Sequence, residues 1–243
     1  MASGTLLVLG IETSCDETSC AVLSCLGSEP AAQPPRHTNR ECKILSNVIS
    51  SSLFRHKEWG GVVPEIASRH CLEQIELVFN QALKEANIRV EDLNLIAVTE
   101  GPGLIGSLFV GMGFGKALSY RLGIPLVAVN HLEAHLAANF IGKPAPEKYV
   151  GLLVSGGHTS LSYHENGKYE LLGETEDDAV GEAYDKVAKI MGLDYPGGPL
   201  LDKLAAKGNP RAIAYSSTSD RNYPVATPHT GAQHVRAPIC FDS

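Results

Sequence analysis

The order of apolar segments along the chain constrains its fold more than any other feature. Apolar runs at 6–11, 19–26 and 43–50 predict three strands, and a helix is expected to begin near Pro64, where apolar residues recur every three or four positions. Clustered strands followed by helices return from residue 149 onward. Because helices cover the faces of such sheets, the pattern predicts two related α/β units.

The remaining elements divide the chain into two subdomains and a tail. Strands are predicted at 95–99, 126–129, 149–155, 159–164 and 169–173, and helices at 106–122, 131–140, 181–191 and through 206. We expect a first subdomain at 1–128 with a loop insertion at 27–42, and a partial second subdomain at 129–210. Few strong hydrophobes occur in 211–243, so this segment is expected to be an irregular tail.

The amino-acid composition and net charge limit which classes of protein and which cellular locations are expected. The 243 residues are 44% hydrophobic and 19% charged, as in soluble globular proteins. No apolar run approaches the roughly 18 residues of a membrane helix, and no basic region precedes the first apolar stretch. Six cysteines without a C-x-x-C pair argue against zinc ligation or a disulfide framework and favour a reducing, cytoplasmic location. With a net charge of −7, a partner or a local basic patch must help in any nucleic-acid binding.

The segment NHLEAH places two histidines four residues apart, directly after a predicted strand. His131 and His135 share a helix face, where two ring nitrogens can bind one metal ion. Ordinary helix-surface histidines are the alternative. The protease motif H-E-x-x-H is a poor match, because Glu133 points roughly 200° away from His131 on an ideal helix.

The segment LVSGGHT at 153–159 leads one predicted strand through a glycine-rich turn into another. Glycines permit a positive φ, so successive backbone N–H groups can converge on a phosphate. An ordinary tight hairpin is the alternative, although the added Ser, His and Thr favour an anion or a metal.

Two further acidic segments are candidates for substrate binding and catalysis. In GEAYDK, Asp185 can accept hydroxyl groups of a ribose or substrate, and the following YPGGP loop can approach a base; solvated helix charges are the alternative. In the turn ETSCDE, the acidic and hydroxyl groups from Glu12 to Glu17, Asp16 among them, can position the metal of a nucleotide or an attacking group, with a capped turn as the alternative. GPGLIG at 101–106 matches G-x-G-x-x-G formally, but no acid ends a following strand, so a dinucleotide site is not expected.

Seven segments occur in a characteristic order: IETSCDET, GGVVPEIASRH, EGPGLIGSL, NHLEAH, LLVSGGHT, DDAVGEAYDK and GLDYPGGPLLDKLA. Over roughly residues 5–210 they resemble the TsaD/Gcp family of tRNA N6-adenosine threonylcarbamoyltransferases, bacterial type, once described as O-sialoglycoprotein endopeptidases. The resemblance implies a two-subdomain fold like those of actin and sugar kinases, with the second subdomain incomplete.

The resemblance also implies an activity, a cofactor and partners. A threonylcarbamoyl group would pass from threonylcarbamoyl-AMP to N6 of adenosine 37 in tRNAs that read codons beginning with adenine. His131 and His135 match the ligands of one divalent ion, Fe²⁺ or else Zn²⁺, and Asp16 and Glu17 are the candidate catalytic residues. The implied partners are TsaB- and TsaE-like proteins, and the implied assembly is a homodimer or a paralogue heterodimer. No association with a membrane is implied. The substrate-binding positions would be Leu153, Val154, Ser155, Gly156, Gly157, Asp185, Gly198 and Asp202.

The sequence departs from the family pattern after residue 210. The FSFSGLK-like segment, the GGVxAN motif and the late Asp that serves as third metal ligand do not appear, and neither Asp220 nor Asp242 is assigned that role. We therefore expect weak metal binding, little or no activity, and exposed apolar surface on the second subdomain. A metallopeptidase, or a non-catalytic fragment that only binds family partners, are the alternatives.

Overall fold

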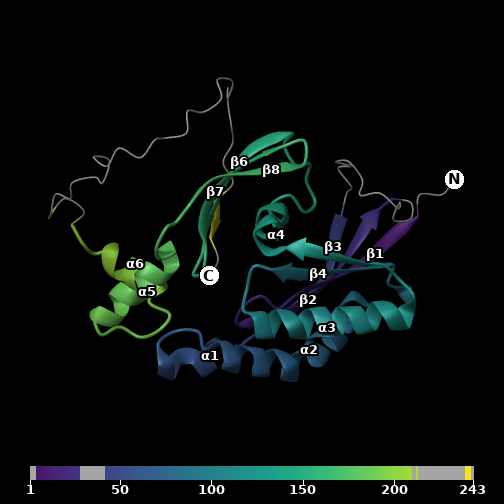
Figure 1. The fold of residues 1–243 in the computed structure, drawn as a ribbon, viewed down its shortest axis with the longest axis horizontal. Coiled ribbons are helices and arrows are strands. Elements are labelled where there is room, and N and C mark those ends of the chain that lie inside the picture. Colours follow the sequence, from purple (N-terminus) through teal and green to yellow (C-terminus); the bar gives the residue numbers. More distant parts are fainter. Residues whose placement is uncertain (1–3, 28–41, 210–211, 213–238, 242–243) are drawn as a thin grey trace. The chain divides into compact units, whose positions relative to one another are not determined.

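The first three strands and two later ones form a single five-stranded sheet with the order β3-β2-β1-β4-β5 (Figure 1). β1 is antiparallel to β2 and parallel to β4, and β5 is parallel to β4. In this computed structural model, the described residues are 4–27, 42–209, 212 and 239–241. The strands are β1 (Thr5–Glu12), β2 (Glu17–Leu26), β3 (Cys42–Ser51), β4 (Leu95–Gly101) and β5 (Leu126–Asn130).

Two long helices cover one face of this sheet and close its core. α2 begins with Pro64 and ends at Ala86, and the capping residue Asn87 adopts a left-handed conformation with φ 55°. Both α2 and α3 pack on the sheet and on each other. The helical elements here are α1 (Leu53–His56), η1 (Lys57–Trp59), α2 (Pro64–Ala86), η2 (Val90–Asp92), α3 (Ile105–Leu122) and α4 (His131–Ala138). The core includes Leu9, Ile11, Val22, Ile75, Val78, Phe79, Ala82, Ile96 and Val98.

Glycines in α3 allow this close packing, as the sequence predicts. A Cβ on Gly115 would lie 2.5 Å from Cγ2 of Val98 in β4. A Cβ on Gly111 would lie 2.2 Å from Oγ1 of Thr13. Neither position has room for a side chain, so α3 can approach the sheet only with glycine there.

A second, four-stranded sheet has the order β8-β7-β6-β9. β6 is antiparallel to β7 and parallel to β9, so its neighbours repeat those of β1 in the first sheet. The elements are β6 (Lys148–Val154), β7 (Thr159–Glu165), β8 (Lys168–Glu174), α5 (Val180–Ile190), α6 (Gly198–Ala205) and β9 (Ile239–Phe241). The predicted two related α/β units are thus confirmed by the strand order.

The chain divides into a compact unit of residues 1–147 with 166–168, and a second of 148–165 with 169–243. This division differs from the boundary expected at 128/129 and keeps α4, with both histidines, in the first unit. β9 lies in the segment that was expected to be irregular. This strand was not predicted, because three residues are too few to show a periodicity. The rest of that tail, except residue 212, and most of the 27–42 insertion lie outside the described residues.

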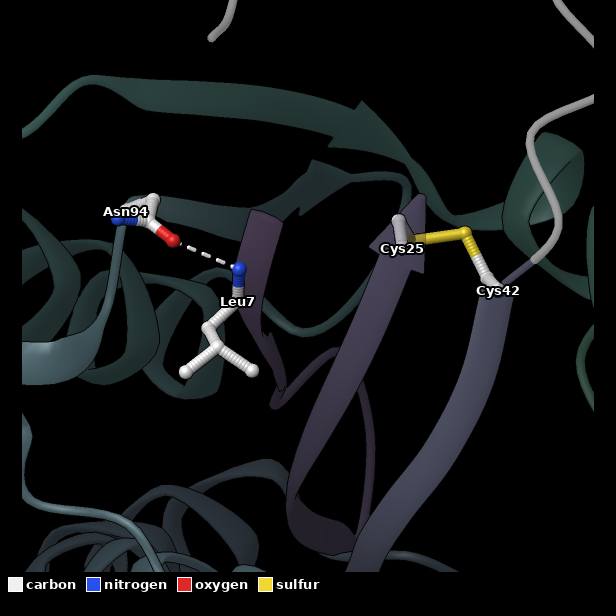
Figure 2. Close-up of a disulfide and its surroundings, with 4 residues drawn as sticks. All are labelled: Leu7, Cys25, Cys42 and Asn94. Carbon is white, nitrogen blue, oxygen red and sulfur yellow. Dashed lines mark hydrogen bonds between the residues drawn. A yellow bond between two sulfur atoms is a disulfide. The ribbon is translucent and has the colours of Figure 1, made fainter. Parts of the chain in front are cut away.

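The prediction that the cysteines form no disulfide is wrong for one pair (Figure 2). Cys25 and Cys42 are partners in the β2–β3 register and are joined by a disulfide, with their Cα atoms 4.1 Å apart. Pairing across two strands is invisible to a search for C-x-x-C, because the cysteines are 17 positions apart. Nearby, the Leu7 N–H in β1 donates to Oδ1 of Asn94, the residue before β4, at 2.7 Å.

Most predicted elements are found within one or two residues of their expected bounds. The helix expected at 131–140 ends earlier, at Ala138. The short helices α1, η1 and η2 were not predicted, because their four, three and three residues are too few to show a helical repeat. Among the helices of the described residues, none has the length and apolar character needed to span a membrane.

Candidate functional site

The two histidines of NHLEAH face each other at the start of α4. Asn130, the last residue of β5, caps this helix, and its side chain accepts hydrogen bonds from the N–H groups of Leu132 and Glu133. The cap fixes the first helical turn directly at the strand end. Nε2 of His131 lies 3.1 Å from Nε2 of His135. The interplanar angle of 76° between the rings is that of an edge-to-face pair.

The spacing of the two Nε2 atoms fits a shared metal ion. Two nitrogens bound at about 2.1 Å to one tetrahedral or octahedral ion are about 2.9–3.4 Å apart. The observed 3.1 Å lies in that range. Within the described residues, no group of three or more His, Cys, Asp and Glu side chains could hold a metal. This part of the chain therefore offers two protein ligands.

Glu12, the first acid of the predicted ETSCDE turn but not one of its two catalytic candidates, is the carboxylate next to His131. Its Oε2 lies 3.1 Å from Nδ1 of His131 and accepts a hydrogen bond from Oγ1 of Thr99 at 2.5 Å. Its Oε1 accepts one from the Ser14 N–H at 2.5 Å. Burial raises the pKa of Glu12, but the hydrogen bonds and charge of His131, with those of Ser14 and Thr99, outweigh it and lower this pKa to about 2.

A positional signal in the sequence could have identified Glu12. It is the last residue of β1, and Thr99 and Asn130 lie at the ends of the parallel strands β4 and β5. The carboxyl ends of parallel strands share one edge of a sheet, where α/β proteins place their sites. The parallel pairing of β1 with β4 was the missing information, because it depends on long-range topology.

The predicted catalytic residues Asp16 and Glu17 lie at the end of the same turn. Asp16 is half-buried, and its backbone carbonyl accepts hydrogen bonds from both the N–H and the Oγ of Ser52, each at 2.8 Å. Glu17 is exposed at the start of β2. The carboxylate placed against His131 is that of Glu12, so a catalytic role for Asp16 and Glu17 stays a prediction.

A buried histidine is hydrogen-bonded to the serine that holds this turn. The His56 side chain is fully buried, its Nδ1 accepts from the Val63 N–H at 3.3 Å, and its Nε2 lies 2.8 Å from Oγ of Ser52. With Nδ1 as acceptor, the proton is on Nε2 and is donated to Ser52, which donates in turn to the Asp16 carbonyl. Burial lowers the pKa of His56, although the charge of Asp16 opposes this.

The N-terminal end of α3 packs directly on the turn. The Leu104 N–H donates to the Ser14 carbonyl at 2.6 Å, and Oγ1 of Thr13 donates to the Ser107 carbonyl at 2.9 Å. A Cβ on Gly103 would lie 2.4 Å from the Ser14 carbonyl oxygen. Since Oγ of Ser14 is 3.2 Å from Nδ1 of His131, α3 helps to place a group beside the histidine pair.

In the second unit, the glycine-rich turn after β6 presents open backbone. Oγ of Ser155 accepts from the His158 N–H at 2.9 Å, and the Ser155 N–H donates to the His158 carbonyl at 2.8 Å, which closes the turn. Gly156 and Gly157 are exposed, and a Cβ on either would meet no atom within 4 Å. Leu153 and Val154, at the end of β6, are buried and half-buried and anchor the turn.

The first turn of α5 lies against this glycine-rich turn. The Gly181 N–H donates to the Ser155 carbonyl at 3.1 Å, and a Cβ on Gly181 would lie 2.8 Å from Cα of Gly156. A helix N-terminus and exposed glycine amides are both favourable to an anion. The local arrangement is therefore suited to a phosphate group.

Asp185 connects the same helix to the glycine-rich loop before α6. Its Oδ1 accepts a hydrogen bond from the Gly197 N–H at 2.7 Å, so it fixes the residue before Gly198. Asp202 is exposed on α6, and Glu182 is exposed and pairs with Lys186 at 3.1 Å. Asp185 and Gly198 thus share one local site in this unit, whereas Glu182 is a solvated helix charge.

Repeated strand order and flanking helices place the chain in the class of two-subdomain α/β proteins that includes actin and the sugar kinases. The sequence profile of TsaD, tRNA N6-adenosine threonylcarbamoyltransferase, matches residues 43–235. The chain therefore belongs to this family, which confirms the resemblance drawn from its seven segments.

Curated relatives agree with the profile. The tRNA N6-adenosine threonylcarbamoyltransferase of Clostridium kluyveri is 52% identical over 212 residues, which are 86% of this chain and 58% of that relative. The Bacillus subtilis enzyme of the same name is 52% identical over 205 residues, 84% of this chain and 55% of that relative. The chain thus spans a little more than half the length of these relatives.

Two solved structures are similar at much lower identity. YeaZ from Pseudomonas aeruginosa is 16% identical with a TM-score of 0.40, and the similarity covers 73% of this chain and 68% of that one. The ROK hexokinase of Thermus thermophilus is 15% identical with a TM-score of 0.44, over 86% and 71% of the two chains.

Proposed function

We propose that this chain acts in the transfer of a threonylcarbamoyl group from threonylcarbamoyl-AMP to N6 of adenosine 37 in tRNAs that read codons beginning with adenine. Family membership over most of the chain carries the proposal, at 52% identity to relatives of that name. In the reaction, N6 bonds to the carbamoyl carbon, the bond from that carbon to the phosphate oxygen breaks, AMP leaves and N6 loses a proton.

The histidine pair is the proposed binding site of one divalent ion, Fe²⁺ or else Zn²⁺. His131 and His135 would hold it through their facing Nε2 atoms, whose 3.1 Å separation supports a shared ion. When bound, the ion supplies Lewis-acid polarisation of the carbamoyl carbonyl. Two protein ligands predict weaker binding than a three-ligand set would give.

The second unit supplies the proposed adenylate site. Backbone N–H groups of Gly156 and Gly157, with the first turn of α5, would bind the phosphate. Asp185 holds Gly197 in place and so positions the loop at Gly198 for the nucleoside. Leu153, Val154 and Ser155 would set the direction of the turn, and Asp202 would accept a substrate hydroxyl.

The two acids of the first turn are the proposed catalytic groups. Ser52 holds the backbone carbonyl of Asp16, which fixes the part of the turn from which its carboxylate extends. With Glu17 it would orient the attacking amine and accept its proton.

Partners are needed for tRNA binding, since the chain carries a net charge of −7. Large apolar side chains are more than half exposed on the helices of the first unit, at Leu72 and Leu77 of α2 and at Ile105, Phe109 and Tyr120 of α3. We assign this surface to a TsaB-like paralogue, with a homodimer as the alternative, and a TsaE-like protein as a further partner. The proposed location is the cytoplasm, where Cys25 and Cys42 would be present as thiols.

The decisive test is tRNA modification by the purified chain with TsaB- and TsaE-like proteins, pre-made threonylcarbamoyl-AMP and Fe²⁺. Threonylcarbamoyladenosine in the digested tRNA is measured by mass spectrometry. We expect product from the wild type, none from His135→Ala, and wild-type yield from the control Glu133→Gln, which changes an exposed acid of the same helix.

Other outcomes would select the alternatives. Equal product from His135→Ala contradicts the proposed metal site. No product, together with co-purification of the TsaB-like protein, would identify a non-catalytic partner-binding chain. Cleavage of a glycoprotein that depends on His131 would instead identify a peptidase.

A further inference from the structure

We infer that Glu12 is a positioning residue for His131. Its carboxylate keeps the ring proton of His131 on Nδ1. The lone pair of His131 Nε2 is then directed toward Nε2 of His135 and a cation bound between them. The inference rests on the proposed function of the histidine pair as metal ligands. It adds a residue from β1 that touches no ion itself.

The surroundings of Glu12 favour an ionised carboxylate that acts as an acceptor. The Ser14 backbone N–H can only donate, and it reaches Oε1 at 2.5 Å. At Oε2 the Thr99 hydroxyl lies at 2.5 Å and Nδ1 of His131 at 3.1 Å. An ionised carboxylate has lone pairs for all three donors and no proton to give.

This acceptor determines the tautomer of His131. Nδ1 must carry a proton to donate to Glu12, so Nε2 of the neutral ring is left as an acceptor. Nε2 of His135, at 3.1 Å, is then the donor to it. When a cation takes this position, the neutral His135 ring carries its proton on Nδ1 instead, so that both Nε2 lone pairs face the ion.

The other neighbour of the ring does not select a tautomer. Oγ of Ser14 lies 3.2 Å from Nδ1 and 3.5 Å from Nε2 of His131, so it is placed beside both nitrogens. A hydroxyl both donates and accepts, which makes it compatible with either tautomer. Of these two neighbours, Glu12 is therefore the one that selects the tautomer.

Glu12 is itself held rigidly enough for this role. It ends β1, its partner Thr99 is 4% exposed in the adjacent parallel strand β4, and His131 begins the helix after β5. Three neighbouring elements thus converge on one carboxylate. Carboxylates that accept from the outer ring nitrogen of a metal-binding histidine orient the ring and raise its basicity.

The variant Glu12→Gln separates positioning from mere structural support. The carboxamide oxygen must face the Ser14 N–H, because its NH₂ group would leave that donor without an acceptor. The NH₂ group is then placed at His131, where it donates to Nδ1. We expect the proton of His131 to move to Nε2, in a side chain of the same shape.

The first measurement uses the metal-free full-length chain labelled with ¹⁵N-histidine, at pH 8. Ring ¹⁵N shifts report the tautomer, and His131→Gln identifies the signals of His131 among the nine histidines. We expect the Nδ1–H form in the wild type and in the control Glu133→Gln, and the Nε2–H form in Glu12→Gln. An Nε2–H form in the wild type, or an unchanged tautomer in Glu12→Gln, would overturn the inference.

The second measurement is Co²⁺ binding, followed by absorbance and calorimetry. Loss of the outer carboxylate is expected to weaken binding about 10- to 100-fold, and Glu133→Gln should leave it unchanged. If Glu12→Gln unfolds, Glu12→Asp is used instead in this measurement. Aspartate keeps the charge, but its shorter side chain no longer reaches His131. We therefore expect it to weaken Co²⁺ binding by the same factor. Wild-type Co²⁺ affinity in either folded variant would contradict positioning.

The two measurements distinguish failure of the inference from failure of the proposed function. A tautomer change without Co²⁺ binding by the wild type supports the role of Glu12 on His131 and refutes the metal site. Co²⁺ binding without a tautomer change leaves the metal site standing and removes Glu12 from it.

Discussion

The first turn of each sheet is built on the same plan but presents different chemistry. After β1 the turn contributes side chains: Glu12 and Ser14 contact His131. After β6 the turn contributes exposed backbone at Gly156 and Gly157. In both, a serine carbonyl accepts an N–H from the start of a helix: Leu104 to Ser14 at 2.6 Å, and Gly181 to Ser155 at 3.1 Å. The same plan therefore presents acidic and hydroxyl side chains in one unit and exposed backbone amides in the other.

The two units also differ in how far their sheets are covered. The core between the first sheet and α2 and α3 contains side chains such as Leu9 and Ile96, both with no exposed surface. In the second unit, every residue of β8 is exposed. On α5, Val187 and Ile190 are 47% and 85% exposed. Among the described residues, the first unit therefore derives more of its stability from apolar burial.

The largest effect is expected from buried leucines, one in β1 and one in β6. Leu9→Ala should lower the free energy of unfolding by about 2–5 kcal/mol, because a fully enclosed side chain leaves a cavity. Leu153→Ala should cost less, since the less covered second sheet can relax around the gap. Urea unfolding followed by circular dichroism measures both, and a larger loss for Leu153→Ala would reverse the comparison.

Reduction of the Cys25–Cys42 disulfide should come next and should affect the first unit only. The bond closes a loop over a separation of 17 residues, which corresponds to about 3 kcal/mol in the chain-entropy description. Dithiothreitol should therefore lower the urea midpoint of the wild type but not that of Cys25→Ser/Cys42→Ser. Cys15→Ser, which changes an exposed free thiol, is the control and should keep the dithiothreitol effect.

The two turns can be compared directly through their packing glycines. Gly103→Ala and Gly181→Ala each force a Cβ within 3 Å of the adjoining turn, and each should cost about 1–3 kcal/mol. Gly157→Ala enters open space and should change stability by less than about 0.5 kcal/mol. Unfolding curves check the order; a costly Gly157→Ala would mean that its turn is enclosed.

The smallest effect on stability is expected on the exposed face of α5. Ile190→Lys should change the free energy of unfolding by less than about 0.5 kcal/mol, because this side chain is 85% exposed. It should nevertheless slow aggregation, measured by light scattering, since apolar surface is removed. The control Glu170→Lys on β8 adds positive charge without removing apolar surface. If this control slows aggregation as much as Ile190→Lys does, the effect is due to charge.

Sequence reasoning predicted the elements that carry strong periodicity and missed what long-range pairing decides. The helix from Pro64 was predicted because its apolar face repeats over 23 residues, whereas η1 has only three. The histidine pair was predicted because both residues lie in one helix, so local geometry is sufficient. Glu12 was placed in the acidic turn, but its contact with His131 was not predicted, because that contact spans 119 positions and requires the edge shared by β1, β4 and β5.

The disulfide at the open end of the β2–β3 pair has a topological consequence. In the oxidised chain, Cys25 and Cys42 are covalently linked on both sides of residues 28–41. A protease cut within that stretch would therefore leave a single covalent molecule, which separates into two fragments only after reduction. Electrophoresis of the nicked chain with and without a thiol would reveal whether the cross-link is present.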